Sequence, residues 1–179
     1  MRALVILALL GGSSWAAAGA VPEPDGYRMD EYRAPVPATL RGARVVDAEA
    51  AHHLWTSGSA AFIDVLPRAP RPENLPEGTI WYDTPRQSIP GALWLPNVGY
   101  GAIAEETAEY FKRGLNTATG GDKDHAVVIF CLAECWMSWN AAKRAQDYGY
   151  SRVIWMPDGT DAWRARGYPI EALTAQPRH

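Results

Sequence analysis

Residues 126–139 read AVVIFCLAECWMSW, and this stretch decides the fold. It opens on a short unbroken apolar run at 126–130, which is typical of a strand buried on both faces of a parallel sheet. Cys131 follows the run directly, and we expect a helix over 138–148, closed by Gly149 as its C-terminal cap. A strand that passes through a short loop into a helix is the repeating unit of an α/β domain.

The neighbouring segments repeat this alternation of strand and helix. Asp47 is a good N-terminal cap for an amphipathic helix over 48–55, and a helix over 105–113 has acidic residues early and basic residues late. Further short runs predict strands at 45–46, 61–66, within 89–96 and at 153–156, and a short helix at 161–166. This order predicts a single α/β domain with a mainly parallel central sheet flanked by helices.

The composition of the 179-residue chain excludes three classes of protein. Hydrophobic residues make up 47% of the chain and the formal net charge is only −3, which excludes a disordered chain. Two cysteines are too few for a disulfide-framework protein. No run of basic residues occurs, which excludes electrostatically driven binding to nucleic acid. Eight tryptophans against three phenylalanines is the unusual feature of the composition.

The first twenty residues predict a cleavable secretory signal peptide. Arg2 supplies a positive charge, an apolar run follows at 3–10, and residues 18–20 match a small-x-small cleavage site. The alternatives are a buried N-terminal helix or a retained membrane anchor, although the apolar run is too short to span a bilayer. Export would place the protein in an oxidising compartment, which is the periplasm in a Gram-negative bacterium, with no membrane attachment after cleavage.

The rest of the chain divides into a lead-in, one domain and a tail. Prolines interrupt residues 21–43, which predicts an extended lead-in. We expect the domain to span 44–172 and a C-terminal tail to span 173–179. Within the domain, residues 67–88 are rich in proline and predict a long loop insertion. Such a loop either serves a function or merely wraps the fold, and the sequence leaves both possibilities open.

Cys131 is the strongest candidate for a reactive residue. Ligands of open α/β sheets bind at the carboxyl ends of the strands, and the following helix N-terminus presents free N–H groups and a positive dipole end. Both features favour a thiolate and so a nucleophilic cysteine. Cys135 lies four residues further on, and a helix-like loop would bring the two Cα atoms within disulfide range. The pair is therefore functional, a purely structural disulfide, or two inert thiols.

The histidines do not extend this site to a metal centre. His52, His53, His125 and His179 are not at ligand spacing from the cysteines, so we expect no metal. His125 precedes the strand that leads to Cys131, which places it at the opposite end of the sheet. His52 and His53 are expected on a solvated helix face.

Several short motifs, in order, resemble those of a rhodanese-like domain. They cover residues 44–172, most of the chain after the signal. The matching stretches are Asp64-Val65 after a strand, the turn Ile89-Pro90-Gly91-Ala92, the strand end Ile129-Phe130-Cys131, and the ending Asp158-Gly159-Thr160-Asp161-Ala162-Trp163 with Gly167-Tyr168-Pro169. The resemblance implies sulfur transfer. Cys131 would attack a sulfane sulfur and hold it as a persulfide for an acceptor thiol, with loop N–H groups around the anion and without metal or organic cofactor.

A narrower resemblance is to exported rhodanese-like proteins named for a CXXCW motif. It rests on residues 131–140, the N-terminal signal and the segment around Trp81 and Trp94. Those proteins are associated with catabolism that depends on pyrroloquinoline quinone (PQQ). The resemblance implies a periplasmic accessory role beside a quinoprotein alcohol dehydrogenase or a c-type cytochrome.

The loop departs from the common rhodanese pattern, and this shapes the candidate site. The expected substrate-contacting residues are Leu132, Ala133, Glu134, Trp136, Met137 and Ser138. Ser138 follows Cys131 by seven positions instead of six, and the loop has no basic residue, which disfavours thiosulfate and phosphoryl substrates. Cys135 could resolve a persulfide on Cys131, which would make the protein a thiol–disulfide or persulfide relay. Trp136 and Trp139 either wall the pocket or pack into the core.

Two residues outside the loop complete the prediction, and one rival function remains. Asp64 either orients loop groups or satisfies local backbone donors, and Trp163 is expected to be structural. The leading hypothesis is an enzyme-like sulfur or thiol handler with Cys131 as nucleophile and Cys135 as resolving thiol. The rival is a non-enzymatic module that binds a quinoprotein dehydrogenase or cytochrome, in which Cys131 and Cys135 form a structural disulfide.

Overall fold

The computed structural model describes residues 21–80, 82 and 84–178. The predicted signal peptide, Trp81 and His179 lie outside the described residues. Among those described, no helix has the length and apolar character that a membrane crossing requires.

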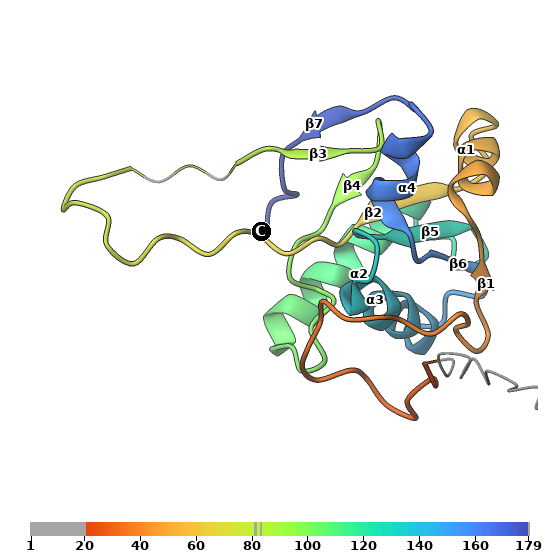
Figure 1. The fold of residues 1–179 in the computed structure, drawn as a ribbon. Coiled ribbons are helices and arrows are strands. Elements are labelled where there is room, and N and C mark those ends of the chain that lie inside the picture. Colours follow the sequence, from red (N-terminus) through yellow and green to blue (C-terminus); the bar gives the residue numbers. More distant parts are fainter. Residues whose placement is uncertain (1–20, 81, 83, 179) are drawn as a thin grey trace, which may run out of the picture.

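A five-stranded parallel sheet forms the centre of the molecule, as the sequence predicts (Figure 1). Its strand order is β1-β6-β5-β2-β4, and every neighbouring pair is parallel. The strands are β1 Arg44–Val45, β6 Val153–Met156, β5 Val127–Phe130, β2 Ala61–Asp64 and β4 Leu93–Trp94. A two-stranded antiparallel ribbon of β3 (Arg86–Ser88) and β7 (Glu171–Leu173) lies beside this sheet.

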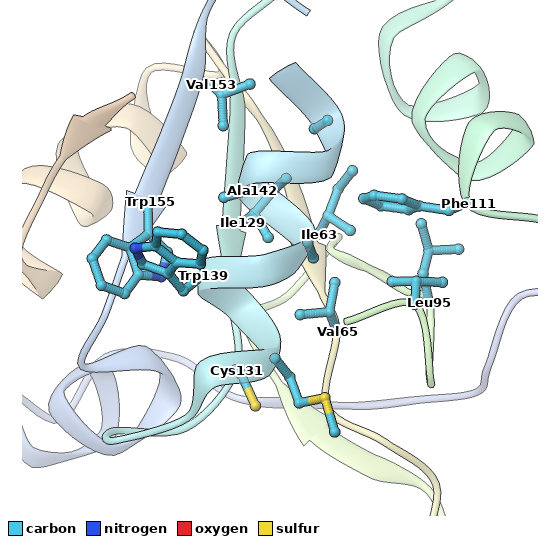
Figure 2. Close-up of a cluster of buried hydrophobic side chains, with 14 of the residues drawn as sticks. Ile63, Val65, Leu95, Phe111, Ile129, Cys131, Trp139, Ala142, Val153 and Trp155 are labelled. Carbon is cyan, nitrogen blue, oxygen red and sulfur yellow. The ribbon is translucent and has the colours of Figure 1, made fainter. Parts of the chain in front are cut away.

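Helices cover both faces of the sheet. The helices are α1 (Ala48–Thr56), α2 (Glu105–Thr119), α3 (Trp136–Asp147) and α4 (Gly159–Ala165). Alternate residues of β5 serve the two faces: Val127 and Ile129 pack with buried side chains of α2 and α3, and Val128 and Phe130 pack with α1 and α4. Figure 2 shows the first cluster, with Trp139 and Trp155 on one side of Ile129 and Phe111 on the other. The central strand is buried on both faces, which explains its unbroken apolar sequence.

Three helices differ in extent from the prediction. α2 continues six residues past the expected end to Thr119, and Gly120 caps it in the left-handed conformation at φ 63°. The helix runs through Gly114, which packs against Leu95. A side chain would not fit there, because an added Cβ would lie 2.4 Å from Leu95 Cδ1. α3 begins two residues early, at Trp136, where Cys135 gives no side-chain cap. α4 also begins two residues early, at Gly159.

The segments expected to lack regular structure are partly integrated into the fold. The last three residues of the predicted loop 67–88 form β3, while residues 70–80 project far from the sheet (Figure 1). Leu173, expected in the tail, ends β7, and the Gln176 N–H donates to the Trp94 carbonyl at 3.0 Å. The lead-in 21–43 lacks helices and long strands, but its backbone makes many hydrogen bonds to α3, described below.

Candidate functional site

The two cysteines lie where β5 ends and α3 begins, as predicted. They form a disulfide with a Cα–Cα distance of 6.3 Å, which confirms that the four-residue spacing brings them within bonding range. Cys131 is 0% exposed and Cys135 is 1% exposed. Figure 2 draws Cys131 at the edge of the hydrophobic cluster, close to where the sheet ends. The oxidised site is therefore closed to solvent at both sulfur-bearing residues.

The loop between the cysteines is held by the start of α4. The Thr160 N–H donates to the Cys131 carbonyl at 3.0 Å, and the Ala133 N–H donates to Asp161 Oδ2 at 2.9 Å. A Cβ added to Gly159 would lie 2.3 Å from the Cys131 carbonyl oxygen, so the close approach of the two backbones requires glycine there. Residues 159–161, at the start of α4, therefore hold the cysteine loop in place.

Asp64 is fully buried at the end of β2 and binds three donors. Its Oδ2 accepts from Arg86 Nε at 2.8 Å and from the Ser88 hydroxyl at 2.6 Å, and its Oδ1 accepts from the Leu66 N–H at 2.9 Å. Burial raises the pKa of this carboxyl, whereas the Arg86 charge and the hydrogen bonds from Ser88 and Leu66 act in the opposite direction. Asp64 therefore satisfies a local backbone donor, which is one of its two sequence-based roles, and it bonds Arg86 and Ser88 rather than a residue of the cysteine loop.

Arg86 is the residue that sequence reasoning missed. One of its terminal nitrogens donates to Thr160 Oγ1 at 2.8 Å and lies 3.5 Å from the Cys131 carbonyl oxygen. Arg86 therefore connects Asp64 at the end of β2 and Cys131 after β5 with Thr160 in α4. It belongs to the segment predicted as a proline-rich loop. The sequence gives no signal for this placement, because Arg86, Gln87 and Ser88 are all polar, although in the structure Arg86 and Ser88 are buried and Gln87 is exposed.

The predicted substrate-contacting residues fall into two groups. Leu132 and Ala133 are half-buried and Glu134 is exposed, with a left-handed backbone at φ 50°. The others belong to the first turn of α3, and their side chains are buried in the core: Trp136, Met137 and Ser138. Ser138 donates to the Cys135 carbonyl at 3.0 Å and accepts from the Trp155 indole N–H at 3.0 Å. In the disulfide form this second group serves packing.

The tryptophans mainly pack and hold the lead-in. The indole N–H of Trp136 donates to the Pro35 carbonyl at 3.1 Å, and that of Trp139 donates to the Thr39 carbonyl at 3.2 Å. Trp163 is fully buried and donates to the Pro169 carbonyl at 2.7 Å, in keeping with its expected structural role. Part of the tryptophan excess therefore fastens an extended segment that has no helix or sheet of its own.

The lead-in places two arginines beside the loop, which has no basic residue of its own, but Arg28 is paired with the carboxylates of Asp30 and Glu31. The Arg28 guanidinium lies 5.3 Å from the centre of the Trp136 ring and pairs with Glu31 Oε2 at 2.6 Å. Arg33 is exposed and bridges to Cys135 through the backbone. Two arginines that are about 100 residues away in sequence thus lie beside the start of α3.

The histidines are distributed as expected, with one difference. His125 precedes β5 at the end opposite Cys131. His52 stacks on Tyr168 with ring centres 3.9 Å apart and is half-buried, whereas His53 is exposed. Within residues 21–178, leaving aside the two undescribed positions, no group of three or more His, Cys, Asp or Glu residues is placed to hold a metal ion.

Comparison with known proteins identifies the fold. No protein-family model and no curated protein sequence matches the chain. Solved structures do match, among them a thiosulfate sulfurtransferase from Pseudomonas aeruginosa with a TM-score of 0.50 and 20% identity, over 76% of this chain and 21% of that one.

Two smaller proteins match over most of their own length. A rhodanese-like domain from Anabaena sp. gives a TM-score of 0.46 and 16% identity, over 72% of this chain and 78% of that one. A human single-domain sulfurtransferase gives 0.43 and 23%, over 69% and 97% of the two chains. Identities this low establish the fold alone. The chain has a rhodanese-like α/β fold, as its motifs predict.

Proposed function

We propose that the protein reduces or relays sulfane sulfur through a Cys131 nucleophile, with Cys135 as the resolving thiol. The observation that carries the proposal is the Cys131–Cys135 disulfide at the carboxyl end of β5, directly before α3. That position favours a thiolate once the disulfide is reduced. A disulfide that closes only a four-residue separation stabilises a domain less than one that closes a long loop, which favours a reactive role over a purely stabilising one.

The chemistry balances without a cofactor. The Cys131 thiolate attacks the outer sulfur of a donor persulfide, R–S–SH, which leaves Cys131 as a persulfide and releases R–SH. The Cys135 thiolate then attacks Cys131 Sγ, forms the disulfide and expels the outer sulfur as hydrosulfide. The sulfane sulfur gains two electrons, and the two thiols lose them. The disulfide seen in the structure is the product of this second step, and a dithiol reductant resets it.

Mass spectrometry of the reduced protein after exposure to a sulfane-sulfur donor tests the proposal. The Cys135→Ser variant should hold a stable adduct of about 32 Da, one sulfur atom, on Cys131. The wild type should instead release hydrosulfide and regain its disulfide, and Cys131→Ser should do neither. Absence of both the adduct and the hydrosulfide would reject sulfur handling by this pair.

We further propose, on the CXXCW resemblance alone, that the protein is exported and assists alcohol oxidation by a PQQ-dependent dehydrogenase. Fractionation of the native host and N-terminal sequencing of the protein test export, since the mature chain should begin at Val21. Deletion of the gene should slow growth on alcohols more than growth on sugars if the accessory role is correct.

A binding module with a structural disulfide is the second candidate. The burial of both cysteines favours it, since a closed disulfide is protected from exchange. Residues 70–80 project from the domain, and Ile80 and the nearby Tyr82 are 73% and 76% exposed. A pull-down of a dehydrogenase or cytochrome that survives Cys131→Ser but fails when residues 70–80 are deleted would favour this candidate. The deletion spares β3 and therefore Arg86.

A further inference from the structure

Residues 28–36 lie along the cysteine loop as an extended segment, which we call the strap. Arg33 forms an isolated antiparallel bridge with Cys135, and the Tyr32 carbonyl accepts the backbone N–H of Trp136 at 2.9 Å. Trp136 is the first residue of α3, so its N–H belongs to the group of free donors at the helix start. While the strap is in place, that donor is not available to an anion at the site.

The inner face of the strap is apolar and covers the core that contains the cysteines. Tyr32, Ala34 and Val36 pack against the hydrophobic cluster that includes Cys131 and Cys135. The residues between them are exposed, so the side chains alternate as they do in a half-buried strand. The strap therefore has the pattern of a sheet strand, yet it is joined to the domain by a bridge at a single residue pair.

A small number of polar contacts fasten the strap to α3 and to the segment before α2. Asn140 clamps one end: its Oδ1 accepts from the Arg28 N–H at 2.9 Å, and its Nδ2 donates to the Arg28 carbonyl at 2.8 Å. At the other end, the Trp136 indole donates to the Pro35 carbonyl at 3.1 Å. In the middle, the Tyr32 hydroxyl accepts from the Gly101 N–H at 3.1 Å. Segments held in this way open at a lower free energy than the core does.

We propose that the strap is a gate over the Cys131–Cys135 disulfide, which reacts only when residues 28–36 leave α3. The proposal deepens the proposed function and rests on it, because it assigns a control element to the same pair of cysteines. In the closed state an incoming thiolate cannot reach either sulfur. In the open state it attacks one sulfur to form a mixed disulfide, and the other sulfur leaves as a thiolate near the freed N–H groups of α3.

The gate predicts which residues control the rate of disulfide reduction. The oxidised full-length protein is treated with dithiothreitol, samples are alkylated over time, and the modified cysteines are counted by mass spectrometry. Trp136→Phe removes the indole bond to Pro35, and Tyr32→Ala removes the central anchor on the strap itself. Trp136→Phe should speed reduction by about fivefold to tenfold, the effect of one lost hydrogen bond. Tyr32→Ala should speed it more, because it removes two hydrogen bonds and the ring contact with Tyr100.

Trp139→Phe is the matched control. Its indole N–H bonds the lead-in at Thr39, one turn further along α3 and outside the strap. Its reduction rate should stay within about twofold of the wild type. Equal rates in all four proteins would overturn the gate, and so would an equal acceleration by Trp139→Phe, since that would indicate a general loosening of α3.

Hydrogen exchange separates opening of the strap from unfolding. In Tyr32→Ala, the Trp136 N–H should exchange faster while the amides of β5 keep their protection. Faster exchange at both would reject a local gate. The reduction assay uses no sulfur donor, so its outcome is independent of the proposed sulfur chemistry. If the strap variants speed reduction but Cys135→Ser forms no persulfide adduct, the proposed function is rejected and the gate stands. If the adduct forms but the strap variants are reduced at the wild-type rate, the gate is rejected and the function stands.

Discussion

Arg86 and Asp64 form a buried ion pair directly behind the cysteine loop. Arg86 Nε lies 2.8 Å from Asp64 Oδ2, and the two side chains are 7% and 0% exposed. The same guanidinium reaches Thr160 and the Cys131 carbonyl, so the pair connects β2, β3, α4 and the end of β5. The geometry of the candidate site therefore depends on a residue that lies 45 positions before Cys131.

Removal of Arg86 should be among the most damaging single changes near the site. Arg86→Ala leaves the Asp64 carboxylate buried without its cation, and we expect the free energy of unfolding to fall by about 3–5 kcal/mol. Urea denaturation followed by circular dichroism measures this. Arg164→Ala is the control, since Arg164 is exposed and donates to the neighbouring Gln87 carbonyl at 2.8 Å. A loss below 1 kcal/mol in Arg86→Ala would show that the pair does not support the fold.

The central strands of the sheet could be predicted from the sequence because each is marked by its own short apolar run. β5 and β6 are short apolar runs, and the burial of every residue in them follows from a parallel sheet covered on both faces. The position of Cys131 at the strand end followed from the same pattern. Arg86 could not be placed in this way, because its partners Asp64 and Thr160 are 22 and 74 residues away. No local periodicity records such contacts.

The lead-in was the larger gap in the prediction. Its prolines correctly indicate an extended chain, but its contacts with α3 span 100 to 112 residues. The tryptophans of α3 were considered as pocket walls or core, whereas their indole N–H groups also hold backbone carbonyls of the lead-in. A hydrogen-bond donor on a buried aromatic ring needs a partner, and the sequence does not reveal which segment provides it.

Ser138→Ala should reduce stability and leave the chemistry of the cysteines intact. The substitution removes the acceptor of the buried Trp155 indole N–H, and an unsatisfied buried donor costs about 1–3 kcal/mol. Chemical denaturation should show this loss, while persulfide formation on Cys131 proceeds at the wild-type rate. Ser57→Ala, at an exposed helix end, is the control and should change stability by less than about 0.5 kcal/mol. Unchanged stability with slower persulfide formation would instead place Ser138 at the substrate.

Reduction of the disulfide should leave the domain folded. The chain-entropy model for so short a loop gives a stabilisation of about 2 kcal/mol, which a domain of this size tolerates. Thermal unfolding with and without a reductant measures the difference, and Cys131→Ser with Cys135→Ser supplies a form that cannot reoxidise. If the reduced chain loses its cooperative transition, the disulfide is a structural element and the binding-module candidate gains.

Gly159→Ala should disturb the cysteine loop through its backbone. The new Cβ would lie 2.3 Å from the carbonyl oxygen of Cys131 and 2.6 Å from its carbonyl carbon, and backbone atoms cannot move away without shifting β5. Gly167→Ala is the matched control, because Gly167 also has a positive φ, of 69°, but an added Cβ there meets nothing within 4 Å. Both variants carry a conformational cost of about 1–2 kcal/mol, and Gly159→Ala should lose about 1–3 kcal/mol more. Equal stabilities in denaturation would mean that the contact between α4 and the loop is loose, and that the loop adjusts independently of the ending motif.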